Sequence, residues 1–243
     1  MKVVAIIQAR MGSSRLPGKV LKQVLGKELL TYQLERVSRS KYMSDVIVAT
    51  TNNNRDKEIV SLCKSLDILY YTGPEEDVLK RYYMAAQHVN ADVVIRLTGD
   101  CPIIDPELID RITETYLLHN PKYQLVTNTL ERTFPRGMDI EVFSLQVLKE
   151  AHKQAVSKPD REHVTRYIVN HPESFSLLNV SNSRNDSHYR WTVDTMEDFI
   201  LIKKIIESLY PQNRNFTMED TINLLAEYPE WQLINKHVQQ KKD

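Results

Sequence analysis

Short apolar runs alternate with amphipathic stretches through the first half of the chain, and this alternation constrains the fold most. The runs at 3–7, 45–51 and 92–98 are rich in β-branched residues, as expected of buried strands. The stretches 55–66 and 77–89 carry apolar residues at helical spacing. Strands that alternate with helices need crossover connections, so the pattern predicts an α/β fold with a mainly parallel sheet.

The second half of the chain is less regular. Alternating apolar residues predict a half-exposed strand over 138–144, and 188–194 is also predicted to be a strand. Residues 145–171 are predicted to form two helices separated at Lys158-Pro159. Two threonines are each followed three residues later by an aspartate, which is the pattern of a capping box. They predict the starts of the last two helices, at Thr195 and Thr217.

The predicted elements belong to one domain over residues 1–243. A chain of 243 residues is long enough to bury a full hydrophobic core. We expect an insertion or flap at about 128–188, where the regular alternation is lost. The last residues, 239–243, are expected to fray.

The composition limits the classes of function. Lys and Arg number 32 and Asp and Glu number 32, so nothing indicates a protein held on nucleic acid by bulk positive charge. No stretch approaches the roughly 20 apolar residues of a membrane span, and the first residues lack the pattern of a secretory signal. Cys63 and Cys101 are too few for a disulfide framework or a zinc cluster. We therefore expect no nucleic-acid partner, no membrane association and a cytoplasmic location.

The strongest functional signal is the segment QARMGSSRLPGK at 8–19, directly after the first predicted strand. Loops at the carboxyl ends of parallel strands are where α/β proteins bind ligands. The first 27 residues carry six cations and no acid. The segment matches neither a Walker A loop nor a GxGxxG loop. It predicts polyphosphate binding, and the alternative is a solvated basic loop; its close-approach glycines and hydroxyl donors are Gly12, Gly18, Ser13 and Ser14.

Two aspartates follow predicted strands and are candidate metal ligands. Asp100 comes just past 92–98, and Asp194 ends 188–194. A buried carboxylate needs a partner, and Mg²⁺ is a hard ion usually held by one or two protein carboxylates. The pair predicts a magnesium site; the alternative is that each aspartate caps the turn or helix that follows it. No histidine is paired with Cys101 in the sequence, so we interpret it as a small buried residue.

Two further segments are candidates for a second substrate site. Asp139 and Glu141 lie two apart on a predicted strand, so both point to one face, where they either accept hydrogen bonds from substrate hydroxyls or face solvent. Arg161 and His163 precede an apolar helix. An arginine there, or Arg136, is a candidate to bind a substrate carboxylate through a bidentate pair. The alternative for each is an ordinary charge near a helix N-terminus.

Three segments, taken in chain order, resemble the motifs of cytidylyltransferases that activate acidic sugars, the CMP-sialic-acid and CMP-KDO synthetase superfamily. These segments are MGSSRLPGK, GDCPIIDP and VDTMED. The fuller pattern is similar to the branch named for spore-coat polysaccharide biosynthesis and covers the chain to about residue 205. Its segments are IIQARMGSSRLPGKVL, EEDVLKRYY, RLTGDCPIIDP, FPRGMDIEVF and REHVTRYI.

The resemblance implies a three-layer αβα fold of the glycosyltransferase-A-like nucleotidyltransferase type. It also implies CTP and a sugar acid as substrates, Mg²⁺ as cofactor, and a homodimer, because the related synthetases are commonly dimers. The site residues that it implies are Arg10, Arg15 and Lys19 on the CTP phosphates, Arg81 near the nucleotide, and Asp100 and Asp194 on the metal.

The chain departs from the sialic-acid synthetases at the last metal motif. Those enzymes usually carry two aspartates spaced by one residue, whereas Val193-Asp194-Thr195 has one, which is closer to the KDO type. The resemblance therefore leaves open whether one metal ion or two are bound.

Residues and resemblance together predict an Mg²⁺-dependent cytidylyltransferase. It transfers CMP from CTP to an acidic sugar, a nonulosonic acid or a KDO-like sugar, and releases pyrophosphate, for surface or spore-coat polysaccharide synthesis. One alternative is a sugar-nucleotide-dependent glycosyltransferase, which usually shows a DxD motif that neither Asp100 nor Asp194 completes. The other is a non-catalytic nucleotide-binding module, against which the retained aspartates and loop cations count.

Overall fold

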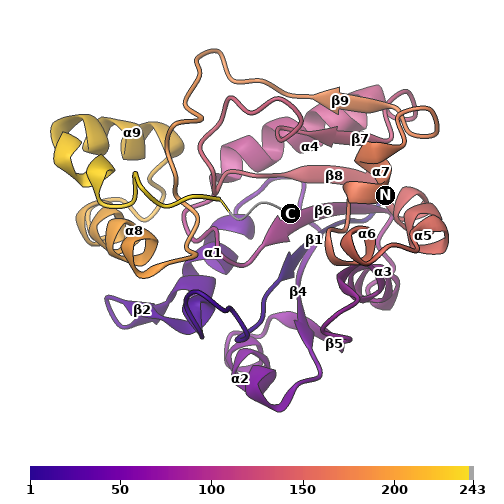
Figure 1. Cartoon of the computed structure of the whole chain (residues 1–243), viewed down its shortest axis with the longest axis horizontal. Helices are drawn as coiled ribbons and strands as arrows, with labels where there is room; N and C mark the ends of the chain where they lie inside the picture. The colour runs from indigo at the N-terminus through magenta and orange to yellow at the C-terminus, as the bar shows by residue number, and fades with distance from the viewer. Residues whose placement is uncertain (241–243) are drawn as a thin grey trace.

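The computed structural model describes residues 1–240, and 241–243, on which part of the expected fraying falls, lie outside the described residues. Within residues 1–240, a seven-stranded sheet has the order β5-β4-β1-β6-β8-β7-β9 (Figure 1). Its strands are β1 (Val3–Gln8), β4 (Asp45–Thr51), β5 (Leu69–Gly73), β6 (Val93–Thr98), β7 (Leu125–Thr127), β8 (Glu141–Ser144) and β9 (Leu177–Asn179).

Helices cover the sheet, and a small hairpin stands apart from it. The α-helices are α1 (Leu29–Val37), α2 (Lys57–Ser65), α3 (Val78–His88), α4 (Pro106–His119), α5 (Leu145–Gln154), α6 (Lys158–Glu162), α7 (Arg166–Asn170), α8 (Met196–Leu209) and α9 (Met218–Glu227). The hairpin and the 3-10 helices are β2 (Gln23–Val24) with β3 (Lys27–Glu28), η1 (Lys19–Leu21), η2 (Asn54–Asp56) and η3 (Pro229–Leu233). None of the helices in the described part is long and apolar enough to cross a membrane.

The sheet is mainly parallel, as the sequence predicts. β1 pairs in parallel with β4 and β6, and β4 pairs in parallel with β5. β8 is the antiparallel strand, lying between β6 and β7, and β7 and β9 pair in parallel. All four strands β5, β4, β1 and β6 therefore end at one edge of the sheet, where the motif loops follow β1 and β6.

Alternate residues of the strands pack into two separate cores, which makes three layers. On β1, Val3, Ala5 and Ile7 belong to the core with apolar residues of α1, α2, α4, α8 and α9. Val4 and Ile6 belong to the core with residues of α3 and α5. This alternation is the period of two expected of a strand buried on both faces, and it confirms the αβα fold class. Figure 1 shows α8 and α9 at the end of the molecule opposite α5 and α6.

Residues 188–194 do not form the strand that the sequence predicts. The segment has one isolated β-bridge to another part of the described chain, between Arg136 and Arg190. A further backbone hydrogen bond joins Val193 N to the Asp100 carbonyl at 2.8 Å, in the loop after β6. The prediction was wrong because consecutive residues 190–194 are buried against loops without pairing with a strand of the sheet.

The predicted strand at 138–144 is shorter, because a side chain takes the place of a neighbouring strand over its first half. Asn128 Nδ2 donates to the Met138 carbonyl at 2.7 Å, and Ile140 N donates to Asn128 Oδ1 at 2.9 Å. The two helices predicted over 145–171 are three, α5 to α7, and a proline lies in the first turn of α6. The capping boxes predicted at the starts of α8 and α9 are confirmed.

Candidate functional site

A cleft of about 530 Å³ opens at the carboxyl ends of β1 and β6. Gln8 and Ala9 line it from the end of β1, and Thr98 and Gly99 from the end of β6. Gly99 N donates to the Gln8 carbonyl at 2.8 Å. A Cβ at position 99 would lie 2.8 Å from that carbonyl oxygen, so only glycine lets the two strand ends meet this closely.

The loop after β1 is shaped by contacts to η2. Met11 N donates to Asp56 Oδ1 at 2.7 Å, and Asp56 is completely buried. Gly18, with φ of 67°, donates its N–H to the Met11 carbonyl at 3.0 Å and closes the loop. The guanidinium of Arg55 lies against Gly12, where a Cβ would come within 2.5 Å of Nη2. Gly12 therefore accommodates Arg55 and does not itself line the cleft.

The cations of this loop meet both predicted metal ligands. Lys19 Nζ lies 2.8 Å from Asp100 Oδ2 and 2.8 Å from Asp194 Oδ1. Arg15 Nη2 lies 2.9 Å from Asp194 Oδ2. Three segments that are far apart in the sequence thus converge on one group of charges inside the cleft.

The charges of Asp100 and Lys19 stabilise each other. Burial alone would raise the pKa of Asp100, but the Lys19 ammonium and its hydrogen bond lower it to about 2. Burial alone would lower the pKa of Lys19, but the charges and hydrogen bonds of Asp100 and Asp194 raise it. The Lys19–Asp100 pair is therefore charged at neutral pH. Burial raises the pKa of the Cys101 thiol well above its usual value, which agrees with its interpretation as a small buried residue.

The two carboxylates fit a magnesium ion that arrives with a polyphosphate. Among residues 1–240 no group of three or more His, Cys, Asp or Glu side chains is arranged to hold a metal by itself. Mg²⁺ usually takes one or two protein carboxylates and completes its shell with phosphate and water. Asp100 and Asp194 supply hard oxygen donors of this kind. The Lys19 ammonium, in contact with both, carries a positive charge that would attract a phosphate oxygen.

The cleft is also lined by two arginines, Arg96 and Arg132, that the sequence motifs do not indicate. Arg132 holds Asp139 through two parallel hydrogen bonds, with Nη2 to Oδ2 at 2.8 Å. Arg96, from β6, pairs with Glu141, which also accepts the Thr165 hydroxyl at 2.6 Å. Asp139 and Glu141 both line the cleft, but each is already bound to an arginine. An arginine among the apolar residues of the predicted strand 92–98 was the available signal for Arg96.

Arg136 and Arg161, the two candidates for a sugar carboxylate, have different surroundings. Arg136 lines the cleft and forms no ion pair with any of the described residues. Burial and the nearby Arg132 lower its pKa, so an anion beside it would be favourable. Arg161 does not line the cleft. Its guanidinium donates to Asp77 at 2.6 and 3.0 Å, which fastens α6 to the start of α3.

The cleft gathers most of the residues that the sequence analysis singles out. Arg81 lines it but is only 1% exposed, with its guanidinium bonded to the Pro74 carbonyl. Arg10 lies at the rim, 3.5 Å from Glu75. The predicted residues that line the cleft are Arg10, Ser13, Ser14, Arg15, Lys19, Arg81, Asp100, Arg136, Asp139, Glu141, His163 and Asp194. Gly12, Gly18 and Arg161 do not line it.

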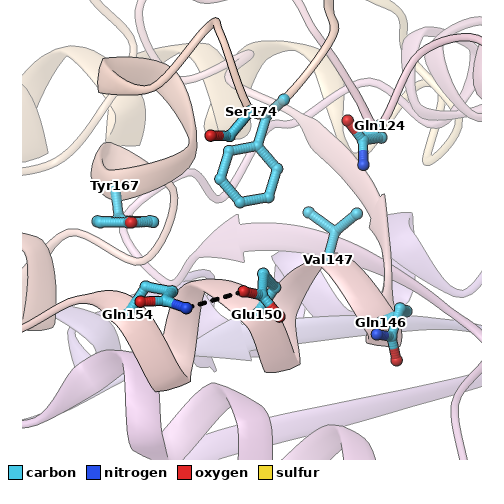
Figure 2. A pocket seen from close by; sticks show the side chains of 8 residues that line it. Gln124, Gln146, Val147, Glu150, Gln154, Tyr167 and Ser174 are labelled. Carbon is cyan, nitrogen blue, oxygen red and sulfur yellow. Dashed lines mark hydrogen bonds between the residues drawn. The ribbon is translucent and has the colours of Figure 1, made fainter.

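A smaller hollow, of about 320 Å³, lies away from this site. Figure 2 shows it above α5, lined by Gln146, Glu150 and Gln154 of that helix and by Tyr167 and Ser174. None of the predicted site residues lines it, and its charged group is one carboxylate that accepts a hydrogen bond from Gln154 at 3.1 Å. The cleft at the strand ends is therefore the candidate active site.

Comparison with known proteins agrees with this geometry. The chain matches the family model described as Cytidylyltransferase over residues 4–223. It belongs to the cytidylyltransferase family. A solved cytidylyltransferase from Leptospira borgpetersenii is 35% identical, with a TM-score of 0.92 and complete coverage of both chains.

Two curated proteins are also similar to this chain in sequence. The spore coat polysaccharide biosynthesis protein SpsF of Bacillus subtilis is 32% identical over 94% of this chain and 95% of its own. A 3-deoxy-manno-octulosonate cytidylyltransferase of Bdellovibrio bacteriovorus is 34% identical over 52% of this chain and 50% of its own. The cytidylyltransferase family match includes the β1 loop, Asp100 and Asp194 but ends before η3, so the last described segment is outside it.

Proposed function

We propose that this cytidylyltransferase transfers CMP from CTP to an acidic sugar, a nonulosonic acid or a KDO-like sugar, with release of pyrophosphate and with Mg²⁺ as cofactor. The observation that carries the proposal is the contact of Lys19 Nζ with both Asp100 and Asp194. The contact brings one cation and two carboxylates together in the cleft. Transfer of a nucleotidyl group requires cations that neutralise phosphate charge and carboxylates that bind a metal ion close to one another.

The loop cations have the role of stabilising phosphate charge. Arg15 and Lys19 lie within the cleft, and Arg10 at its rim, so the three can contact the β and γ phosphates that leave as pyrophosphate. Asp100 and Asp194 would hold Mg²⁺, which when bound neutralises phosphate charge and acidifies a nearby hydroxyl. The reaction needs mostly positioning and charge neutralisation, and these residues supply both. Ser13 and Arg81 line the cleft and complete the proposed nucleotide side, and Gly12 shapes the loop beside Arg55.

The acceptor side is proposed from Arg136, a cation that lines the cleft. Among residues 1–240 it has no acidic partner, so its planar guanidinium is available to a sugar carboxylate. Asp139 and Glu141, held by Arg132 and Arg96, present remaining lone pairs to sugar hydroxyls. The relatives SpsF and the 3-deoxy-manno-octulosonate cytidylyltransferase, named for polysaccharide synthesis and for a sugar acid, support an acidic acceptor and a place in surface or spore-coat polysaccharide synthesis. A cytoplasmic location and a homodimer are part of the same proposal.

The test is pyrophosphate release with each of the four nucleoside triphosphates against a panel of acidic and neutral sugars. We expect release with CTP and an acidic sugar, dependent on Mg²⁺, and its loss in Asp100→Asn. Release with neutral sugars alone would contradict the acidic acceptor. Transfer from a sugar nucleotide without any pyrophosphate would point to a glycosyltransferase instead.

A further inference from the structure

Asp194 lines the cleft and is also bound by Arg190 and Asp198, two residues that do not line it. Arg190 Nη2 donates to Asp194 Oδ2 at 2.8 Å, and the Asp194 backbone N–H donates to Asp198 Oδ2 at 3.0 Å. Arg190 Nε also donates to Asp198 Oδ1 at 2.9 Å. These contacts fix the carboxylate so that its other oxygen, Oδ1, is the one that faces Lys19 at 2.8 Å.

Asp198 is the centre of this support. It is completely buried, and as the third residue of α8 it also completes the capping box with Thr195. Burying a carboxylate costs folding free energy unless its oxygens accept hydrogen bonds. Asp198 accepts hydrogen bonds from the guanidinium of Arg190, from the side chain of Asn235, and from the backbone of Asp194 and Thr195. Its hydrogen bonds therefore tie the start of α8 to the candidate metal ligand.

Asn235 brings the segment after η3 into the same network. Its side chain is 4% exposed, and Nδ2 donates to Asp198 Oδ1 at 2.8 Å and to the Arg190 carbonyl at 2.9 Å. Five residues further on, Gln240 Oε1 accepts from Arg190 Nη1 at 2.8 Å. Arg190 is thus enclosed between Asp194, Asp198 and a segment that lies beyond the family match at 4–223.

We propose that Asn235 is a positioning residue for the reaction. Asn235 binds Asp198 and the Arg190 carbonyl, and these two residues in turn hold Asp194 with its Oδ1 toward Lys19. The inference rests on the proposed function, because it gives Asp194 the role of a metal ligand. Groups that orient a metal ligand without touching the metal typically change metal affinity or activity by about 10- to 100-fold when they are removed.

The experiment compares Asn235→Ala with Gln232→Ala in the full chain. Gln232 is a matched control, because it lies in the same segment and its amide donates to a carbonyl at 3.0 Å, that of Leu225, away from Asp194. Mn²⁺ binding is measured by electron paramagnetic resonance in the presence of CTP. In Asn235→Ala we expect Mn²⁺ binding to weaken about 10-fold and kcat to fall about 10-fold, with KM for CTP changed less than about threefold. In Gln232→Ala all three should stay within about twofold.

The outcomes separate this inference from the proposed function. Equal Mn²⁺ binding by Asn235→Ala and the unchanged protein, or equal losses in the two variants, overturns the inference alone. Absence of CTP-dependent Mn²⁺ binding in the unchanged protein overturns the proposed function as well. If Asn235→Ala does not fold, Asn235→Ser, which keeps one hydroxyl donor, is judged by the same criteria. If that variant also fails to fold, Asn235 has a structural role and the inference is wrong.

Discussion

Asp194 Oδ1 and Lys19 Nζ lie 2.8 Å apart although 175 residues separate them along the chain. The lysine comes from the start of η1, and the aspartate precedes the first turn of α8. Asp100, which follows β6, completes the group at 2.8 Å from the same ammonium. The chemistry proposed for the cleft depends on this meeting point, and four predictions test it and its surroundings.

The first prediction concerns the two carboxylates. Asp100→Asn and Asp194→Asn should each lower kcat at least about 100-fold while the protein stays folded, because an amide is a poor ligand for Mg²⁺. Steady-state kinetics and circular dichroism check this. Asp92→Asn is the matched control, since Asp92 is an exposed carboxylate at the opposite end of β6, bonded to Lys2 N. Turnover near the normal rate at saturating Mg²⁺ in either cleft variant would exclude that residue as a metal ligand.

The second prediction concerns the outer phosphates. Arg15→Ala and Lys19→Ala should weaken CTP binding about 10- to 100-fold and CMP binding much less, because a charge-assisted contact contributes about 1.5–3 kcal/mol. Isothermal titration calorimetry with both nucleotides measures the difference. Lys22→Ala is the control, because Lys22 lies over the Phe199 ring and does not line the cleft. Equal losses for CTP and CMP would contradict the placement on the outer phosphates.

The third prediction separates the two arginines. Arg136→Leu should raise KM for the sugar about 10- to 100-fold and leave CTP binding nearly unchanged, because it removes the cation available to a sugar carboxylate. Arg136→Lys should restore binding only in part, since an ammonium lacks the planar fork. Arg161→Leu should instead destabilise the protein by about 1.5–3 kcal/mol through loss of the Asp77 pair, with sugar KM unchanged. A normal sugar KM in Arg136→Leu would place the carboxylate elsewhere or indicate an acceptor without one.

The fourth prediction follows from the pKa of Asp100, which the fold lowers from 3.8 to about 2. Folding favours the charged carboxylate, so its stabilisation is present above pH 4 and is lost as the pH falls through 2. The contribution at neutral pH is on the order of 2 kcal/mol. Urea unfolding at pH 6, 4 and 2.5 should show Asp100→Asn less stable than the unchanged protein at pH 6, with the difference reduced to about one third of that value at pH 2.5. A constant difference across this range would mean that Asp100 does not titrate as described.

Much of the first half of the fold could be predicted because its signals are local. A strand buried on both faces, such as β1, needs an unbroken apolar run, and an amphipathic helix needs a period near 3.6, so each is visible in a short window. The starts of α8 and α9 were visible for the same reason, since a cap is a contact between neighbours in the sequence. The three-residue strands β7 and β9 carry too few residues to show a period.

The sequence by itself determined the types of chemistry available to this protein: a basic loop after the first strand, and aspartates placed where strands and extended segments end. It did not determine which charges are already paired. Asp139 with Arg132, Asp77 with Arg161, and Asp194 with Arg190 are contacts between side chains whose partners are chosen by packing. Only the tertiary structure therefore decided that Arg136 is available and Arg161 is not, because burial and charge pairing depend on residues brought together from distant parts of the chain.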